Sequence, residues 1–492
     1  MELAQELRAS LQDFLTGATI EIRENGSRIT AIAPLSWEVR GDEGKPLLHL
    51  WAENCNVTRR VLAIADQSDA RLALAVERFG RSKPERLEMV RLEFVPTAKE
   101  LSREEYCERL RRILAEQFPD DVVEKISISS DLEHSLSRMY ARGIARRGAT
   151  TCAFLAVPNS ESVDTLESSL TYALLWVERA RQSAAGAKIS ALRLILPKGK
   201  SPLLARRLSA LGPRCPIAVY ELDPISEKLE KVDPCATGNI ATWLVPRRET
   251  QLLLDRAEDA VAPIVALASD AITIHPSVQT GEVVLRFRGL LFARWQDGRI
   301  FFDVHGLWQE LNARTELPLK QLLLNLQNFR NPLASDSRHP LYRGQSERWL
   351  QSLVAQDLSR TDINLHPDLL YEQVFAQSAG QRGVLDLLAV TRGGRLAILE
   401  LKAAGNVDLP LQAADYWSRI RHHQQAGDFV RYGYFPGLQL SSAAPIVYLI
   451  SPALHFHPST DAMLRYLSPE IEVIRIGVTE SWRRGIRVVM RQ

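Results

Sequence analysis

The spacing of hydrophobic and polar positions changes at about residues 100, 225 and 340, and these changes divide the chain into four regions. Residues 1–100 contain short runs in which hydrophobic and polar residues alternate, which is the spacing of half-buried strands. Two of these runs, 18–23 and 28–33, flank Asn25-Gly26, a strong hairpin signal. The pattern predicts a β-rich N-terminal domain, built as a small open sheet or a barrel.

Helical and strand-like spacings alternate in residues 101–224 and again in residues 340–492. Ser102 and Glu105 form a capping box before a helix at 104–117, and the elements that follow have the order of an α/β domain. Because the last region repeats that order, we hypothesise two copies of one fold, the first of which has lost its active site. The alternative is that α/β domains share such an order by default. Residues 225–339 form a connector with a helix at 250–268 and a hairpin that turns at Asp297-Gly298.

The composition indicates which class of protein this is, but it does not identify a binding partner. A chain of 492 residues, 46% of them hydrophobic, predicts two or three domains with large cores and contains no apolar run long enough to span a bilayer. The start of the chain is acidic and amphipathic, unlike a signal peptide. Five cysteines lie far apart without a CxxC pair, which predicts reduced thiols, a cytoplasmic location and neither zinc nor disulfides. The net charge of +2 indicates no partner, but arginines crowd the end of the chain and could meet phosphate. They could equally form a solvated surface.

Three ionisable side chains interrupt two apolar runs in the last region. Residues 383–390 are apolar apart from Asp386, and the run 395–402 carries Glu400 and Lys402 near its end. An ionised carboxylate within a strand covered on both faces costs several kcal/mol unless it is paired or binds a metal. Side chains alternate along a strand, so Glu400 and Lys402 share a face. Pairing of the two strands through the short turn between them would bring Asp386 near Glu400.

The two carboxylates and the backbone carbonyl of Leu401 would form an oxygen-only pocket, which suits Mg²⁺ or Mn²⁺. A divalent ion in such a pocket lowers the pKa of bound water and stabilises charge on a phosphoryl oxygen. Lys402 would orient the attacking water and offset the developing negative charge. The other interpretation is a satisfied ion-pair network, in which Lys402 neutralises Glu400 or Asp386 at a strand end.

The spacing Asp-x13-Glu-x-Lys, with Gly383 three residues before Asp386, resembles the PD-(D/E)XK nuclease superfamily. It is most similar to the RecB-like and mismatch-endonuclease-like branches, and the resemblance covers about residues 340–476. One departure is that no proline precedes Asp386, although RecB-like members commonly carry Gly-x-x-Asp instead. The resemblance implies an α/β multidomain protein whose C-terminal domain has a restriction-endonuclease-like αβββαβ core.

The helix predicted at 409–423 extends the resemblance. Gln412 and Tyr416 match the Gln-x-x-x-Tyr element of RecB-like nucleases, which implies that Gln412 lies near the active site. One face of this helix carries a set of polar side chains for which we predict catalytic or nucleic-acid contacts: Gln412, Tyr416, Arg419 and His423. The neighbouring face is predicted to be buried: Leu409, Ala413, Trp417 and Ile420.

Members of the superfamily often have a further metal-binding glutamate on the helix before the sheet, and Glu347 is the candidate here. Its spacing from Leu350, Val354 and Leu358 places it on the face of the predicted helix 346–358 that is expected to pack against the core. A carboxylate at the start of a helix also stabilises the helix dipole without any catalytic role. Glu372, on the first predicted strand, is a second candidate for the same position.

These patterns predict a cytoplasmic, Mg²⁺- or Mn²⁺-dependent nuclease that hydrolyses phosphodiester bonds, with DNA as the expected substrate. The competing hypothesis is a non-catalytic nucleic-acid-binding or regulatory protein that uses a nuclease-like fold, because fold does not guarantee function. A third possibility combines the two: an effector-gated nuclease whose preceding regions sense a ligand or partner. The expected domains are residues 1–100, 101–224, 225–339 and 340–492.

Overall fold

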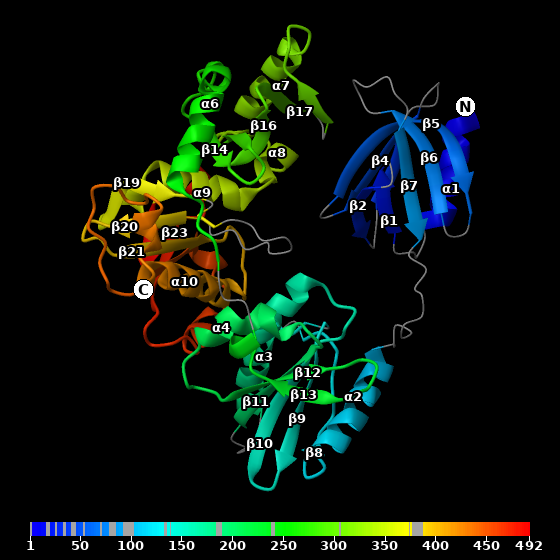
Figure 1. Ribbon diagram of the computed structural model, residues 1–492, viewed down its shortest axis with the longest axis vertical. Helices are drawn as coiled ribbons and strands as arrows, with labels where there is room; N and C mark the ends of the chain where they lie inside the picture. The colour runs from blue at the N-terminus through cyan, green and yellow to red at the C-terminus, as the bar shows by residue number, and fades with distance from the viewer. Residues whose placement is uncertain are drawn as a thin grey trace. The chain divides into compact units, whose positions relative to one another are not determined.

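The computed structural model describes most of the chain, in the following ranges: 2–15, 20–24, 27–32, 36–40, 46–52, 55–68, 71–77, 85–91, 103–131, 135–137, 139–183, 189–237, 242–304, 307–372, 374–375 and 387–492. The protein is a multidomain α/β protein that divides into two compact units (Figure 1). The first comprises residues 1–99, 292–294 and 299–324, and the second comprises residues 100–291, 295–298 and 325–492. None of the helices in the described ranges has the length and apolar character needed to cross a membrane.

The N-terminal part of the first unit is a seven-stranded antiparallel sheet in the order β2-β1-β7-β6-β5-β4-β3. Its elements are α1 Glu2–Leu15, β1 Ile20–Glu24, β2 Ser27–Ile32, β3 Ser36–Arg40, β4 Leu47–Ala52, β5 Cys55–Gln67, β6 Arg71–Glu77 and β7 Glu85–Arg91. The predicted hairpin is present, since Glu24 pairs with Ser27. Leu7, Leu11 and Phe14 lie on one face of α1 and are buried in the same core as the strands, as the helical period requires.

A five-stranded sheet, in the order β14-β15-β16-β17-β18, occupies the connector. The elements here are α5 Pro234–Thr237, α6 Arg247–Val265, β14 Ile272–Ser277, β15 Glu282–Phe287, β16 Leu290–Gln296, β17 Arg299–Val304, β18 Leu307–Glu310, α7 Glu316–Phe329 and α8 Pro340–Arg343. A turn at Arg288-Gly289 separates β15 from β16. Gly289 has φ +80°, and a Cβ there would lie 2.2 Å from the carbonyl oxygen of Arg348. Only glycine fits this close approach.

The middle domain contains a six-stranded sheet in the order β8-β9-β10-β11-β12-β13. Its elements are α2 Arg103–Gln117, β8 Val122–Val123, β9 Ala141–Arg147, β10 Thr150–Ala156, α3 Val163–Ser183, β11 Ile189–Pro197, η1 Ser201–Leu204, α4 Ala205–Ser209, β12 Ile217–Leu222 and β13 Leu229–Val232. The pairs β10–β11 and β11–β12 are parallel, and the other three pairs are antiparallel.

The C-terminal domain contains a second six-stranded sheet, in the order β19-β20-β21-β22-β23-β24. Its elements are α9 Ser346–Gln356, η2 Leu358–Arg360, β19 Leu365–Tyr371, β20 Leu387–Thr391, β21 Leu396–Leu401, α10 Leu409–Gln425, α11 Asp428–Arg431, β22 Ile446–Pro452, η3 Ala453–His455, α12 Thr460–Leu464, β23 Glu472–Val478, η4 Trp482–Arg484 and β24 Val488–Arg491. Again the third, fourth and fifth strands run parallel and the remaining pairs are antiparallel.

The two six-stranded sheets therefore have the same strand order and the same sequence of parallel and antiparallel pairs. The crossover helices also correspond, because α3 and α10 join the third and fourth strands, and α4 and α12 join the fourth and fifth. A difference in strand order would have excluded the hypothesis of two copies, and none is found. The shared topology supports that hypothesis.

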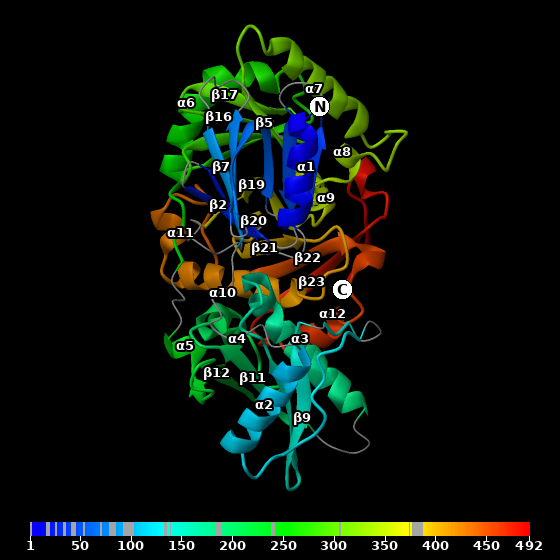
Figure 2. The same cartoon turned by 90° about the vertical axis from the view of Figure 1, so that its right-hand side faces the viewer.

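The corresponding helices pack against one another in a reciprocal way. Helix α10 contacts α4, and α3 contacts α12 (Figures 1 and 2). The segments that follow α4 and α12 form an antiparallel bridge between Leu211 and Leu467, with Gly212 N donating to Tyr466 O and Ser468 N donating to Ala210 O. The two domains therefore contact each other through corresponding elements, which is the arrangement expected around an approximate two-fold axis.

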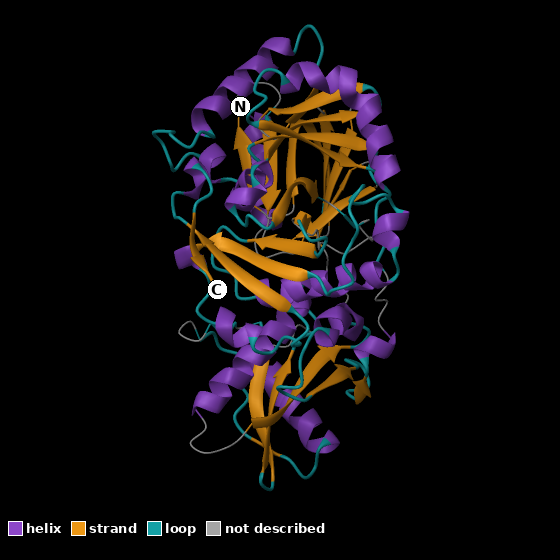
Figure 3. Cartoon of the chain, turned by 90° about the vertical axis from the view of Figure 1, so that its left-hand side faces the viewer, coloured by secondary structure: helices purple, strands orange, loops and turns teal. Residues whose placement is uncertain are grey.

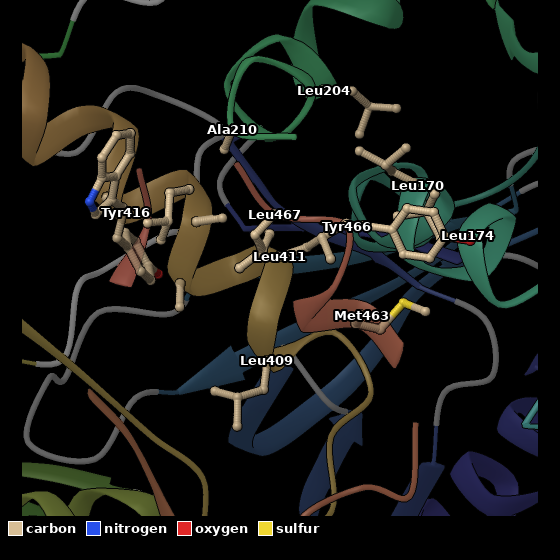
Figure 4. Close-up of a cluster of buried hydrophobic side chains, with 14 of the residues drawn as sticks. Leu170, Leu174, Leu204, Ala210, Leu409, Leu411, Tyr416, Met463, Tyr466 and Leu467 are labelled. Atoms are coloured by element: carbon tan, nitrogen blue, oxygen red, sulfur yellow. The ribbon is translucent and has the colours of Figure 1, made fainter. Parts of the chain in front are cut away.

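A continuous hydrophobic core fills this helical layer between the two sheets (Figures 3 and 4). Leu170 and Leu174 of α3 are buried with Leu409 and Leu411 of α10 and with Met463 of α12. Because side chains of both domains share one core, the two domains form a single packed body rather than independent modules.

Candidate functional site

Strand β21 is buried along its whole length and carries the first candidate residue, Glu400, with a side chain only 1% exposed. Leu399 and Leu401 belong to the core that includes Leu350 of α9, whereas Ile398 belongs to the core that includes α10. Since side chains alternate along a strand, Glu400 lies with Ile398 on the α10 side of the sheet.

Lys402 follows directly after β21, where its backbone nitrogen donates to Ile450 O at 3.0 Å. Its ammonium group lies 3.6 Å from Glu400 Oε1 and 3.3 Å from Glu347 Oε2. Lys402 is 11% exposed in this position, and Glu347 is 48% exposed. One buried ammonium therefore holds two carboxylates, one from the sheet and one from the first turn of α9.

The structure brings together three of the predicted site residues, Glu347, Glu400 and Lys402. Asp386 lies outside the described residues, so its predicted place beside Glu400 remains a prediction. Within the described ranges, no group of three or more His, Cys, Asp or Glu side chains is arranged to hold a metal. The described part of the site thus supplies two carboxylates, Glu347 and Glu400, as charged ligands for a cation.

Glu372, the second candidate for the position of Glu347, lies elsewhere. Its carboxylate is 2.8 Å from His275 Nδ1 and 3.8 Å from Arg286 Nη1. Burial alone would raise the pKa of Glu372, but the hydrogen bond from His275 and the nearby positive charges outweigh burial and lower it. Its ion pairs with His275 and Arg286 join it to the connector sheet, whereas Glu347 pairs with Lys402.

Helix α10 begins at the predicted residue and ends two residues later than predicted, and its predicted apolar face is buried: Leu409, Ala413, Trp417 and Ile420. Gln412 is half-buried, and its Nε2 lies 3.5 Å from the hydroxyl of Tyr416. The prediction that Tyr416, Arg419 and His423 contact nucleic acid does not agree with their burial, because they are only 1%, 5% and 3% exposed. The helical period correctly placed these residues on one face, but a domain core covers that face.

Arg419 and His423 have partners within the protein. Arg419 Nη2 donates to Asp415 Oδ2 at 2.6 Å, and His423 Nδ1 lies 2.8 Å from Asp428 Oδ2. The other ring nitrogen of His423 lies 2.6 Å from the hydroxyl of Thr242. Burial lowers the pKa of His423, and the hydrogen bond with Asp428 only partly opposes this effect. These contacts indicate a structural role for both side chains.

The sequence interpretation missed a charged network between the middle and C-terminal domains. Arg207 Nη1 donates to both carboxylate oxygens of Asp408, at 2.7 and 3.0 Å, and Arg206 Nε donates to Asp415 Oδ1 at 2.6 Å. Burial lowers the pKa of Arg207, but the charges of Asp408 and Asp415 outweigh burial and raise it. The consecutive arginines 206 and 207 on a short helix were the available sequence signal, and only the fold places acidic partners opposite them.

The middle domain has no counterpart of the candidate site at the equivalent positions. Val157 N donates to Ile195 O at 2.9 Å, as Lys402 N donates to Ile450 O, and both bonds continue a parallel strand pair. This register makes Leu155 equivalent to Glu400, and Val157 equivalent to Lys402. Both middle-domain residues are buried hydrophobics. One topology therefore occurs twice in this chain, once with an ionisable cluster and once with an apolar strand end.

Comparisons with protein-family models, with curated proteins and with solved structures find no match to this chain.

Proposed function

We propose that the C-terminal domain is a Mg²⁺- or Mn²⁺-dependent nuclease that hydrolyses phosphodiester bonds, with DNA as the expected substrate. The observation that carries this proposal is the buried carboxylate of Glu400, held with Glu347 on the single ammonium of Lys402 at the end of an apolar strand. Buried ionisable clusters are costly in a core and are more common at functional sites than elsewhere.

The order of elements supports a restriction-endonuclease-like core. Helix α9, strands β19, β20 and β21, helix α10 and strand β22 follow one another in the αβββαβ order that the resemblance implies. Glu400 is on the third strand and Lys402 directly follows it, as the Glu-x-Lys motif requires. The polar residue Gln412 is in the first turns of the next helix, on the side of the sheet that Glu400 faces.

Each residue has a distinct role in the proposed reaction. Glu400, Glu347 and the carbonyl of Leu401 would hold the metal, and Asp386 joins them in the proposal on its sequence spacing alone. A bound divalent ion would supply an acidic water and charge stabilisation at a phosphoryl oxygen. Lys402 would turn from its carboxylate partners to donate to the attacking water or to a phosphate oxygen. Gln412 would position the phosphodiester backbone through its amide.

The chemistry of the described ligands fits Mg²⁺ better than a softer metal. Mg²⁺ accepts one or two protein carboxylates and keeps several waters, so two carboxylates are sufficient when substrate phosphate completes the shell. Zinc sites are built mainly from Cys and His, with at most a minority of carboxylates. The half-exposed carboxylate of Glu347 leaves one side of the cluster open to solvent.

Cleavage of supercoiled plasmid and of single-stranded oligonucleotides with Mg²⁺ or Mn²⁺ tests the proposal. We expect Asp386→Asn, Glu400→Gln and Lys402→Ala each to lose activity by at least about 100-fold, the usual scale for a charge-stabilising group. Two matched substitutions should retain activity: Glu472→Gln, on strand β23 of the same sheet, and Lys198→Ala, in the middle domain. Full activity in Asp386→Asn and Lys402→Ala would contradict the assignment.

A non-catalytic nucleic-acid-binding or regulatory role is the second candidate, and the middle domain is the observation that favours it. That domain shows that this topology folds in the same chain with Leu155 and Val157 in place of the ionisable pair. Calorimetric titration with Mn²⁺ separates the two functions. A nuclease site should give binding heat that Glu400→Gln abolishes, whereas a scaffold should give none.

A further inference from the structure

A cavity of about 480 Å³ lies in the second unit, beside the connector sheet and α9. Its walls come from α6, β14 and β15 of the connector and from α9 and β19 of the C-terminal domain. The volume is within the range of small-molecule sites, about 300–1,000 Å³. Nothing in the proposed nuclease reaction uses this cavity.

The cavity is rich in positive charge. Three arginines line it, Arg247, Arg286 and Arg348, together with His275, and Glu372 is the one acidic side chain among the described lining residues. Glu372 is already engaged by His275 at 2.8 Å and by Arg286 at 3.8 Å. Among the described lining residues, three guanidinium groups therefore accompany one carboxylate in a partly enclosed space.

Arg286 and Arg348 act on each other as like charges. Burial and the neighbouring charge of Arg348 lower the pKa of Arg286, although Glu372 partly opposes this effect. The Arg286 side chain is 14% exposed. Two guanidinium groups that line one partly enclosed cavity repel each other, and an anion bound between them would offset this cost. Guanidinium forks match the oxygens of phosphate in particular.

Aromatic rings form another part of the lining. Tyr371, Phe375 and Tyr434 contribute to the wall, and the guanidinium of Arg247 lies 4.7 Å from the ring centroid of Tyr371 and 5.8 Å from that of Tyr434. Guanidinium planes and tyrosine rings both stack on heteroaromatic bases. The cavity thus combines an anion site with a surface for a flat ring.

We propose that this cavity binds a nucleotide-sized ligand, with its phosphate on Arg286 and Arg348 and its base against Arg247 and the aromatic wall. The site takes a mononucleotide or a compact derivative of one, because the volume is too small for a folded nucleic acid. This binding does not depend on the nuclease activity proposed above.

Calorimetric titration of the full chain with each of the four nucleoside 5′-monophosphates tests the site, beside adenosine and inorganic phosphate as the two separate halves of one ligand. We expect saturable binding of at least one nucleotide, tighter by at least about tenfold than binding of either half. Arg247→Gln and Arg286→Gln should each weaken binding by at least about tenfold, since each removes a charged contact. Arg248→Gln is the matched control, because Arg248 is the exposed neighbour of Arg247 on α6 and does not line the cavity.

Arg286→Gln removes the ion pair with Glu372 and could prevent folding. Arg247→Gln leaves that ion pair in place, so this variant still tests the proposal if Arg286→Gln does not fold. Circular dichroism melting of each variant establishes that it is folded. The proposal is overturned if no nucleotide saturates at millimolar concentration, or if folded Arg247→Gln binds as tightly as the native protein. It is also overturned if phosphate alone binds as well as the nucleotides, or if only oligonucleotides bind.

Discussion

Substitution of Lys402 by methionine isolates the electrostatic role of its ammonium group. Methionine keeps most of the apolar stem, so the change removes a charge with little loss of packing. The structure predicts lower stability, because Glu400 is 1% exposed and loses the cation that lies 3.6 Å from its Oε1. The loss should be largest without divalent metal.

The magnitude follows from distance and burial. Two unit charges separated by 3.6 Å attract each other by about 4–5 kcal/mol at an effective dielectric constant of roughly 20. The desolvation cost of the buried lysine is recovered when its charge is removed, so the net loss is smaller. We expect the free energy of unfolding of the second unit to fall by about 3 kcal/mol, which for a unit of this size is roughly 4 °C in Tm.

Urea denaturation and thermal melting, each with EDTA and with Mg²⁺, measure this effect. If Glu347 and Glu400 bind a divalent ion, Mg²⁺ should replace the missing charge and restore much of the stability of Lys402→Met. At 100 times its Kd, a ligand contributes about 2.7 kcal/mol. Lys198→Met is the matched control, since Lys198 is 63% exposed and should show no measurable change.

Two outcomes would refute this reasoning at different steps. Unchanged stability of Lys402→Met in EDTA would mean that the ion pair with Glu400 contributes nothing to the fold. A destabilised variant that Mg²⁺ does not rescue would support the ion-pair network and contradict the metal site.

Three other features give testable expectations. Asp408→Asn should lower the free energy of unfolding by about 3 kcal/mol in urea titration, because it breaks the buried pair with Arg207, and equal stability would contradict that role. His423 has a folded-state pKa below its ordinary value of 6.5, so the unfolded chain binds the proton more readily and stability should fall as pH drops below about 6.5. Urea midpoints at pH 7.5 and 5.5 should differ less in His423→Gln than in the native protein. If both proposed sites exist, a nucleoside monophosphate should change the rate of Mg²⁺-dependent cleavage, and Arg247→Gln should abolish the response.

Much of the fold follows from residue periodicity. The limits of α10 agree with the predicted range 409–423 within a few residues, because long amphipathic helices repeat their pattern over several turns. Edge strands were harder to predict. Strand β24, for example, is a four-residue, partly exposed edge strand without a buried run to mark it. Strand β9 was missed because its sequence, Ala-Arg-Gly-Ile-Ala-Arg-Arg, has three arginines and a glycine.

The candidate site could be predicted only in part, because the sequence shows which residues are charged but not always whether the fold buries them. Glu400 and Lys402 were identifiable because charge within an apolar strand is rare and needs a physical cause. Arg419 and His423 carry charge on a helix, where the same pattern usually indicates a solvated face. Arg419 pairs with Asp415 one turn earlier on the same helix, and His423 pairs with Asp428 and Thr242, but the burial of both comes from the elements that pack against α10 in the tertiary fold.

Helix α9 connects the two proposed sites through consecutive residues. Glu347 points to Lys402, and Arg348, the next residue, lines the cationic cavity. The turn at Gly289 packs against the backbone of Arg348 so closely that a Cβ has no room, so the start of α9 has little freedom to shift by itself. A ligand that draws Arg348 toward its phosphate would therefore act on the segment that positions Glu347. If nucleotide binding alters cleavage, the first turn of α9 is the direct connection between the two sites, because Glu347 and Arg348 are consecutive residues. We then expect the nucleotide to change the metal affinity by moving Glu347. Glu400 should move less, because it is held in the middle of the sheet.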